Sequence, residues 1–511
     1  MSESRTVNTL RNSSIALIYY GVSLLLNFVS RKVFLDKLGM EILGLNTTAN
    51  NLLSFLNLAE LGIGFAISFA LYTPIAKGDK DAINEIVSLQ GALYKRIALF
   101  IIAGAAILSL FFPLIFAKMA LPMWYAYASF GVLLYSALLS YFINYRQIIL
   151  TASQQDYKIT LSYKACLLIK ILFQIFVLSY FDNPYIWWLA TEVIFTTLAS
   201  LWLNVIIRRN HPYLERSKQS FRELRRKYPL IVTKVKQLFF HKIAAFAVTQ
   251  TSSLIIYGFL SLTAVTLYGN YLLLTSGAIL LLSSVFNGVG ASVGNLIASG
   301  DRSRILSVFE ELFCVRFLLS ALSSICICCF ASDFVILWIG PDYVLPPATV
   351  VLISISMYLT VSRGVVDTFL NGYGLFKDIW APVAEAVINI GASIAGGALW
   401  GLNGIIGGAV LSMVLIVFLW KPHFLFSQGI RYPIGFYVTI YAKCLIVGAV
   451  MTLLALAIKR YTPIDASSSA TDFIIVCSLV AVVICIAGFV AEYILCKGMR
   501  QFSRRIFSFL H

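Results

Sequence analysis

The sequence has few charged residues for its length. Of 511 residues, 12% are Asp, Glu, Lys or Arg and 59% are hydrophobic, whereas soluble domains carry about 25% charged residues. Apolar runs of about 18 residues or more recur along the chain, which is the pattern of membrane-spanning helices. Because a bilayer offers backbone polar groups no other partner, we predict an all-α integral membrane protein.

Motifs for metal, cofactor and nucleotide chemistry are scarce as well. The nine cysteines lie in or beside apolar runs and the four histidines are scattered, so we expect apolar filler and no metal site or cofactor. The dipeptide Gly-Lys, which a GxxxxGK[ST] phosphate loop requires, does not occur. No polar segment is long enough to fold as a catalytic domain. We therefore expect neither an enzyme nor an ATP-driven pump.

The apolar runs predict about 14 transmembrane helices. Two of them exceed the roughly 20 residues needed to cross a bilayer, so we expect these two to tilt or bend. The expected spans are 14–34, 42–74, 97–117, 122–143, 159–181, 185–207, 237–259, 265–298, 312–332, 346–371, 380–400, 402–420, 435–457 and 473–495.

Basic residues are distributed unevenly between the predicted loops. If the N-terminus is cytoplasmic, segments on the inner side hold 29 of the 39 Lys and Arg, and segments on the outer side hold 6. The positive-inside rule therefore predicts that both termini are cytoplasmic. The remaining four basic residues fall within predicted spans and are Lys170, Lys242, Arg363 and Lys443.

The longest polar stretch, 208–229, divides the spans into two groups. It is strongly basic and lies between apolar runs, so we expect a cytoplasmic linker on anionic headgroups rather than a nucleic-acid-binding segment. We predict an N-terminal six-helix lobe, a basic linker, a C-terminal six-helix lobe, and two additional helices with a basic tail. Their boundaries are 1–207, 208–236, 237–420 and 421–511.

The two groups of spans carry similar motifs at a nearly constant offset. Gly-Asp at 78–79 recurs at 300–301, and LTASQQDYK at 150–158 is echoed weakly by FLNGYGLFK at 369–377. Chance similarity of glycine-containing spans is the alternative explanation. Two echoes at about 220 residues favour a duplicated lobe in a parallel pseudo-twofold repeat, with the substrate path between the halves.

Three stretches resemble a known family. They are LAELGIGFAISFALYTPIAKGD at 58–79, NYRQIILTASQQDYK at 144–158 and EAVINIGASIAGGALWGLNGIIGGAVLS at 385–412. They resemble the polysaccharide and O-antigen flippases of the multidrug/oligosaccharidyl-lipid/polysaccharide exporter superfamily, which also holds lipid II flippases and multidrug extruders. Many O-antigen flippases are described with twelve spans, whereas this chain has fourteen, as lipid II flippases do.

The resemblance covers essentially the whole chain and implies a function. It implies export of undecaprenyl-diphosphate-linked oligosaccharide repeat units from the inner to the outer leaflet of a bacterial inner membrane, for O-antigen or capsule-like polysaccharide synthesis. The transport would proceed by alternating access, driven by H⁺, Na⁺ or the membrane potential. The partners it implies are the lipid-linked glycan, the bilayer and other polysaccharide assembly proteins, and not nucleic acid.

Basic residues within or near spans are candidates for binding the lipid diphosphate. A charge inside a membrane costs a few kcal/mol, so each needs a partner or a water-filled cavity. Arg363 is the first choice because its guanidinium can grip phosphate through two hydrogen bonds. The alternative is that Arg363 pairs with Asp367, four residues later on the same helical face. The further candidates are Lys170 and Lys164, with Gln174 on the same stripe, and Lys242 and Arg146, for which ordinary interfacial anchoring is the alternative.

Acidic residues in the spans are candidates for ion coupling or charge pairing. They are Glu60, Asp367, Glu385 and Glu192. A partly desolvated carboxylate there could carry protons or coordinate sodium. Glu60 has no acidic counterpart in the second group of spans, which favours a functional role, and a hydrogen-bonded structural carboxylate is the alternative.

Two other functions compete with the flippase. A cation-coupled multidrug exporter would be expected to have a more acidic or apolar cavity, whereas both signs of charge occur here. A membrane-embedded enzyme of polysaccharide assembly is disfavoured by the short outer loops and by the lack of a carboxylate or histidine cluster.

Overall fold

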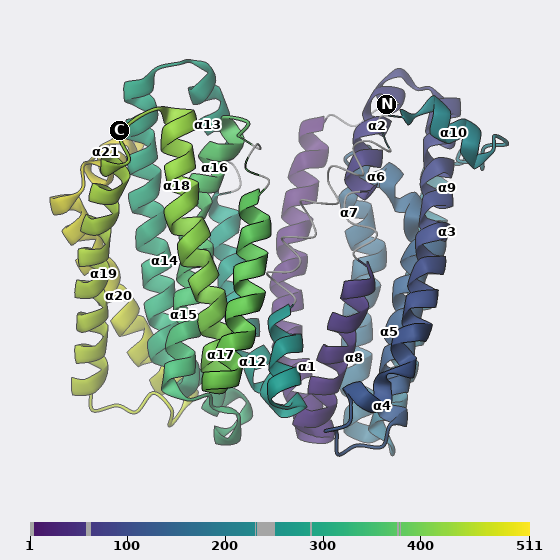
Figure 1. The fold of residues 1–511 in the computed structure, drawn as a ribbon, viewed down its shortest axis with the longest axis horizontal. Coiled ribbons are helices and arrows are strands. Elements are labelled where there is room, and N and C mark those ends of the chain that lie inside the picture. Colours follow the sequence, from purple (N-terminus) through teal and green to yellow (C-terminus); the bar gives the residue numbers. More distant parts are fainter. Residues whose placement is uncertain are drawn as a thin grey trace. The chain divides into compact units, whose positions relative to one another are not determined.

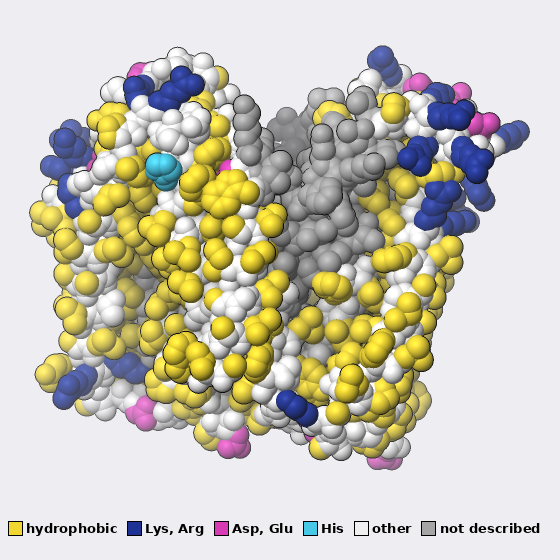
Figure 2. Space-filling view, in the orientation of Figure 1, with side chains coloured by type: hydrophobic (Ala, Val, Ile, Leu, Met, Phe, Trp, Pro, Cys, Tyr) yellow, Lys and Arg dark blue, Asp and Glu magenta, His cyan; other side chains and the backbone are white. Residues whose placement is uncertain are grey.

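The computed structural model describes residues 5–57, 63–229, 231, 251–286, 289–375, 378 and 380–510. Every regular element within these ranges is a helix (Figure 1). Eleven segments of the described chain are long and apolar enough to cross a membrane. The surface in Figure 2 is mainly hydrophobic along the middle of each group of helices, and Lys and Arg gather near their ends. The predicted all-α, multi-pass membrane fold is confirmed.

The chain divides into two compact units. Unit 1 comprises residues 1–257 with 261–266, and unit 2 comprises 258–260 with 267–511. In unit 1, α1 packs against α5 and α8, while α9 packs against α5 and α8. The elements of unit 1 are α1 (Arg5–Leu56), α2 (Ile63–Lys77), α3 (Lys80–Leu110), α4 (Phe112–Ile115), α5 (Trp124–Phe142), η2 (Asn144–Gln147), α6 (Ile148–Ala152), α7 (Asp156–Ile159), η3 (Thr160–Lys164), α8 (Ala165–Tyr180), α9 (Pro184–Asn210) and α10 (Phe221–Lys227).

Unit 2 is organised around one long helix, α14. It contacts α15, α19, α20 and α21, and its buried face is rich in Phe. The elements are α12 (Leu262–Phe286, whose first residues belong to unit 1), α13 (Val289–Ala298), α14 (Arg302–Ile339), η4 (Pro341–Tyr343), α15 (Pro347–Ser362), α16 (Gly364–Gly372), α17 (Trp380–Ser412), η5 (Met413–Trp420), α18 (Lys421–Phe424), η6 (Leu425–Ile430), α19 (Gly435–Tyr461), α20 (Ala470–Leu495) and α21 (Lys497–Leu510).

Backbone breaks relate these helices to the predicted spans. α1 is interrupted at Gly39 (φ 82°), which separates the first predicted span from the second. α17 is interrupted at Gly401 (φ 56°), between the predicted spans 380–400 and 402–420. The described parts of the two unusually long spans lie in α1 and α2 for the first and in α12 and α13 for the second. Most of the span predicted at 237–259 lies outside the described residues.

Glycines allow the two halves of α17 to pack closely against each other as a hairpin. A Cβ atom on Gly404 would lie 1.9 Å from the carbonyl oxygen of Gly396, and one on Gly408 would lie 2.3 Å from the amide nitrogen of Ser393. The Ser393 hydroxyl also donates to the Ile405 carbonyl at 2.8 Å. Small residues let membrane helices approach this closely. The glycine-rich stretch at 385–412 therefore serves helix packing.

The Gly-Asp motif has the same local structure in both units. Gly78 (φ 68°) and Gly300 (φ 74°) each end a helix in the left-handed conformation that favours glycine. Asp79 and Asp301 then cap α3 and α14, because each side chain accepts the N–H three residues later at 3.0 Å. The sequence echo thus corresponds to a repeated helix-turn-helix junction.

The weaker echo is also a repeated turn, in a register shifted by one residue. Gln154 (φ 59°) and Gly374 (φ 65°) each donate to the carbonyl three residues back, at 3.0 Å in both turns. The residue after each donates to the carbonyl five residues back. These bonds pair Gln154 with Gly374, whereas the sequence alignment of 150–158 with 369–377 pairs Gln154 with Tyr373. Both turns are therefore of the type that commonly ends a helix.

The basic stretch at 208–229 folds back onto α3 within unit 1. The carboxylate of Glu85 accepts hydrogen bonds from Gln219 Nε2 and Lys227 Nζ, both at 2.8 Å, and from the Tyr228 hydroxyl at 2.6 Å. Burial, together with the bond to Glu85, raises the pKa of the Tyr228 hydroxyl above its usual range. The segment is therefore held by specific contacts as well as being partly helical through α10.

Candidate functional site

A cluster of charged side chains lies inside unit 2. The guanidinium of Arg363, at the junction of α15 and α16, donates through Nε to Asp367 Oδ2 at 2.9 Å. Its Nη1 lies 3.6 Å from Glu385 Oε1 on α17. Lys421 Nζ, at the start of α18, donates to Asp367 Oδ1 at 3.0 Å. We call these four residues the charged cluster.

Local helix geometry brings the members of the charged cluster together. Arg363 and Asp367 are one turn apart, which places both on the same face of the helix. Lys421 follows directly after the π-helical segment η5, and π-helical turns often occur at functional sites. The side chains of Arg363 and Asp367 are 25% and 32% exposed, whereas Glu385 is 6% exposed. Arg363 and Asp367 are thus the two members most accessible to a ligand.

A further buried cation, Arg316 on α14, lies beside the charged cluster. Its Nε donates to the Val361 carbonyl at 2.7 Å, and its guanidinium lies over Gly364, where a Cβ would be 2.2 Å from the guanidinium carbon. It is near enough to Asp367 for electrostatic attraction. With Arg316, three cations face two carboxylates, so the region carries an excess of positive charge. Such a region can bind an anion.

Sequence reasoning missed Arg316 and Lys421. Both lie at the edges of predicted inner-side segments, where the positive-inside pattern indicates ordinary membrane anchors. The sequence offers one indication that Arg316 lies here. Arg363 is followed by Gly364, and a residue without a side chain leaves room for the guanidinium of a neighbouring helix. Nothing in the sequence pattern connects Lys421 with Asp367, 54 residues earlier.

A second ion pair is buried in unit 1. Lys170 Nζ on α8 lies 2.8 Å from Glu192 Oε1 on α9, and their side chains are 14% and 11% exposed. Gln174 Nε2 donates to the other carboxylate oxygen at 3.0 Å. Lys164 is not part of this group, since its Nζ lies 5.5 Å from the ring centre of Tyr19. The predicted stripe of Lys164, Lys170 and Gln174 is therefore divided between two environments.

Arg146 lines a surface pocket at one end of α5 and α9. The pocket has a volume of about 370 Å³, and Arg208 and Asn204 also line it. Arg146 Nε donates to the Tyr145 hydroxyl at 3.2 Å. Two guanidiniums beside apolar side chains would suit an anionic headgroup. The remaining candidates, Lys242 and Glu60, lie outside the described residues.

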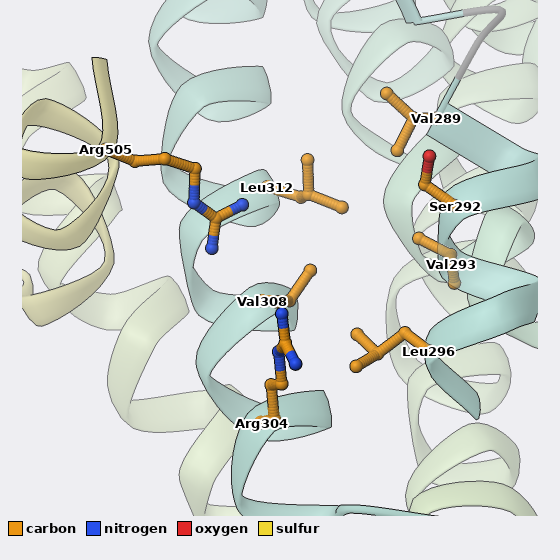
Figure 3. Close-up of a pocket in the computed structure, with 8 residues that line it drawn as sticks. All are labelled: Val289, Ser292, Val293, Leu296, Arg304, Val308, Leu312 and Arg505. Carbon is orange, nitrogen blue, oxygen red and sulfur yellow. The ribbon is translucent and has the colours of Figure 1, made fainter. Parts of the chain in front are cut away.

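A similar pocket in unit 2 lies between α13, α14 and α21. Figure 3 shows Arg304 and Arg505 on one side of it and apolar side chains, among them Val293 and Leu296, on the other. Its volume is about 370 Å³. Arg505 is held by Glu311, with 2.9 Å between Nη2 and Oε2. This pocket would also suit an amphipathic anion and is separate from the charged cluster.

The fold of this chain is shared with solved multi-pass membrane transporters. Comparison with protein-family models gives no match, and comparison with curated proteins gives none either. Among solved structures, the chain is similar to the lipid II flippase MurJ in an inward closed conformation, with 13% identity and a TM-score of 0.64. That alignment covers 94% of this chain and 98% of the flippase.

Two further solved structures have the same fold. One is a multidrug resistance MATE family transporter of the MOP superfamily in its inward-facing conformation, with 15% identity, a TM-score of 0.56, and coverage of 82% of this chain and 98% of that one. The other is a MOP superfamily transporter from Pyrococcus furiosus, with 15% identity, a TM-score of 0.52, and coverage of 84% and 98%. These similarities confirm the predicted fold, which is also found in members of the superfamily that the sequence resembles.

Proposed function

We propose that this protein is a flippase for undecaprenyl-diphosphate-linked oligosaccharides. It would move repeat units of an O-antigen or capsule-like polysaccharide from the inner to the outer leaflet of a bacterial inner membrane, with both termini cytoplasmic. The observation that carries the proposal is the charged cluster with its neighbour Arg316, an excess of positive charge inside a membrane bundle. A diphosphate is the anionic part of such a lipid, and Arg binds phosphate through paired hydrogen bonds.

The exchange of ion-pair partners gives this site a transport mechanism. Without substrate, Asp367 and Glu385 neutralise Arg363, which lowers the cost of holding a cation in the membrane. An arriving diphosphate competes with Asp367 for the guanidinium, while Lys421 still holds the displaced carboxylate. When the substrate leaves on the opposite side, the Arg363–Asp367 pair forms again and favours release. The site therefore binds the anion strongly only while the pair is open.

An ion gradient would supply the direction of transport. The buried Lys170–Glu192 pair in unit 1 provides a carboxylate that could bind a proton or Na⁺ in place of its lysine partner. The same observation favours the second candidate function, a cation-coupled exporter of cationic drugs, because that activity needs a buried acid rather than a phosphate site. A lipid-diphosphate flippase would require the charged cluster, whereas an exporter of cationic drugs would require the Lys170–Glu192 pair.

Reconstitution of purified protein into liposomes tests the proposal. The assay follows the transfer of a fluorescent undecaprenyl-diphosphate oligosaccharide between leaflets, for the wild type, Arg363→Gln and Arg363→Lys. Loss of a charge-assisted hydrogen bond worth about 1.5–3 kcal/mol should slow flipping about tenfold or more in Arg363→Gln. Arg302→Gln, at an exposed arginine beside the Tyr432 ring, is the control and should flip at the wild-type rate.

Two results would refute the proposal. The first is an undiminished rate in Arg363→Gln with correctly folded protein. The second is a wild type that does not flip the lipid but exports a cationic dye in a manner that Glu192→Gln abolishes. That result would establish the drug exporter instead.

A further inference from the structure

Three of the nine cysteines converge at one place in unit 2. Cys314 lies on α14, Cys444 on α19, and Cys496 directly after the last residue of α20. Each of the three is 0% exposed, and the three sulfur atoms all lie within 4.8 Å of one another. Residues far apart in the sequence thus present three thiols to a common point.

The spacing of these sulfur atoms suits a thiophilic metal ion. Thiolates bind Zn²⁺ at about 2.3 Å in tetrahedral sites, which puts neighbouring sulfur atoms about 3.8 Å apart. The three sulfur atoms lie within 4.8 Å of one another, and small rotations of their side chains would bring them to that spacing. Sites with three thiolates are completed by a fourth ligand from the protein or from water.

A buried carboxylate one helical turn before Cys496 supplies a second observation. Glu492 is 0% exposed, and neither of its carboxylate oxygens has a hydrogen-bond partner in the described part of the chain. It precedes Cys496 by one helical turn, and the Cys496 N–H donates to its carbonyl at 2.8 Å. Burying a carboxylate without partners is costly, so such a group must take up either a proton or a ligand. Carboxylate oxygen is an established zinc donor.

The surrounding charges would balance a loaded site. Three thiolates, one carboxylate and one divalent ion carry two negative charges in sum. The positive charges of Lys443, beside Cys444, and Arg500, on α21, lie close enough to act on Cys496. The two cations offset the excess.

We propose that the three converging cysteines Cys314, Cys444 and Cys496 bind one thiophilic divalent metal ion, with Zn²⁺ as the preferred ion and Glu492, one helical turn before Cys496, as the fourth ligand. This differs from the sequence-based expectation that all nine cysteines are apolar filler. The ion would fasten α19 and the end of α20 to α14, the central helix of unit 2. Its role would be structural, because it would link the last two long helices to each other and to α14.

Metal analysis of the full-length protein tests this site. The protein is purified in detergent under reducing conditions without chelator, incubated with Zn²⁺ and freed of excess ion, and its zinc content is measured by mass spectrometry. We expect about one zinc per chain in the wild type and less than a tenth of that in Cys314→Ser and Cys444→Ser. Cys166→Ser, at a buried thiol of unit 1, is the matched control and should retain the zinc.

A second set of measurements tests the site even if the cysteine variants do not fold. Wild-type protein loaded with Co²⁺ should show the near-ultraviolet charge-transfer absorption of thiolate–cobalt bonds. Glu492→Gln, which keeps all three thiols, should bind Zn²⁺ at least tenfold more weakly in competition with a chelating dye. A reduced wild type that binds no zinc or cobalt would overturn the proposal. So would an intact mass showing that two of the three cysteines form a disulfide under these conditions.

Discussion

Arg363 and Asp367 form an ion pair one helical turn apart, with 2.9 Å between Nε and Oδ2, and the same carboxylate also binds Lys421 at 3.0 Å. Asp367→Asn removes the negative charge that these two cations share. Glu385 is then the remaining carboxylate of the charged cluster. We expect the free energy of unfolding to fall by about 1–3 kcal/mol, because charge-assisted hydrogen bonds are lost. We also expect tighter binding of a lipid diphosphate and slower release, since Arg363 no longer has a competing partner.

Thermal unfolding in detergent and binding of the fluorescent lipid diphosphate measure the two effects of Asp367→Asn. Asp342→Asn is the control, since Asp342 is an exposed acid of η4 outside the charged cluster. Weaker binding of the lipid by Asp367→Asn would contradict the exchange of partners. In that case Asp367 would hold the guanidinium in position for the substrate rather than compete with it.

The Lys170–Glu192 pair in unit 1 should show strong energetic coupling. Removing one member of a buried pair typically costs about 3–5 kcal/mol, because the other charge stays buried without a partner. Lys170→Met and Glu192→Gln should each destabilise the protein, and the double variant should be less destabilised than the sum of the two. A double-mutant cycle of unfolding free energies measures this coupling. Additive effects would show that the two charges do not depend on each other.

Glu85 should control whether the basic segment 208–229 stays on α3. Its carboxylate binds Gln219, Lys227 and Tyr228, so Glu85→Ala removes three hydrogen bonds at once. We expect trypsin to cut the segment at least about tenfold faster, because an opening free energy lower by 1.4 kcal/mol or more gives that factor. Glu215→Ala is the control, since the Glu215 backbone N–H donates to Asn84 and its side chain has no bond to the described residues. Equal cleavage rates would mean that other contacts hold the segment.

Patterns local in the sequence predicted much of the fold and part of the site. Hydrophobic runs predicted the helical bundle, and the Gly-Asp echo predicted matching junctions, because a left-handed glycine followed by a capping Asp is a local signal. The Arg363–Asp367 pair follows from a spacing of four residues on a helix. These features depend on residues within a turn or two of each other.

Features created by packing between distant segments could not be predicted. Lys421 reaches Asp367 only because α16 and α18 lie together. Arg316 is buried against Gly364 through the packing of α14. The three converging thiols come from three segments, and no spacing in the sequence indicates them. Each of these contacts depends on which helix faces meet, and hydropathy does not determine that.

The hairpin of α17 offers a test with its control on the same helix. A Cβ on Gly404 would lie 1.9 Å from the Gly396 carbonyl oxygen, whereas a Cβ on Gly407 would meet no atom of the described residues within 4 Å. Gly404→Ala should lower the free energy of unfolding by about 1–3 kcal/mol or more, because the two halves of the hairpin must separate. Gly407→Ala should be neutral or stabilise the helix by up to about 1 kcal/mol, since alanine loses less conformational entropy than glycine. Thermal unfolding of both variants in the same detergent measures the difference. Equal stability of the two variants would show that the backbones of the hairpin do not pack as closely as described.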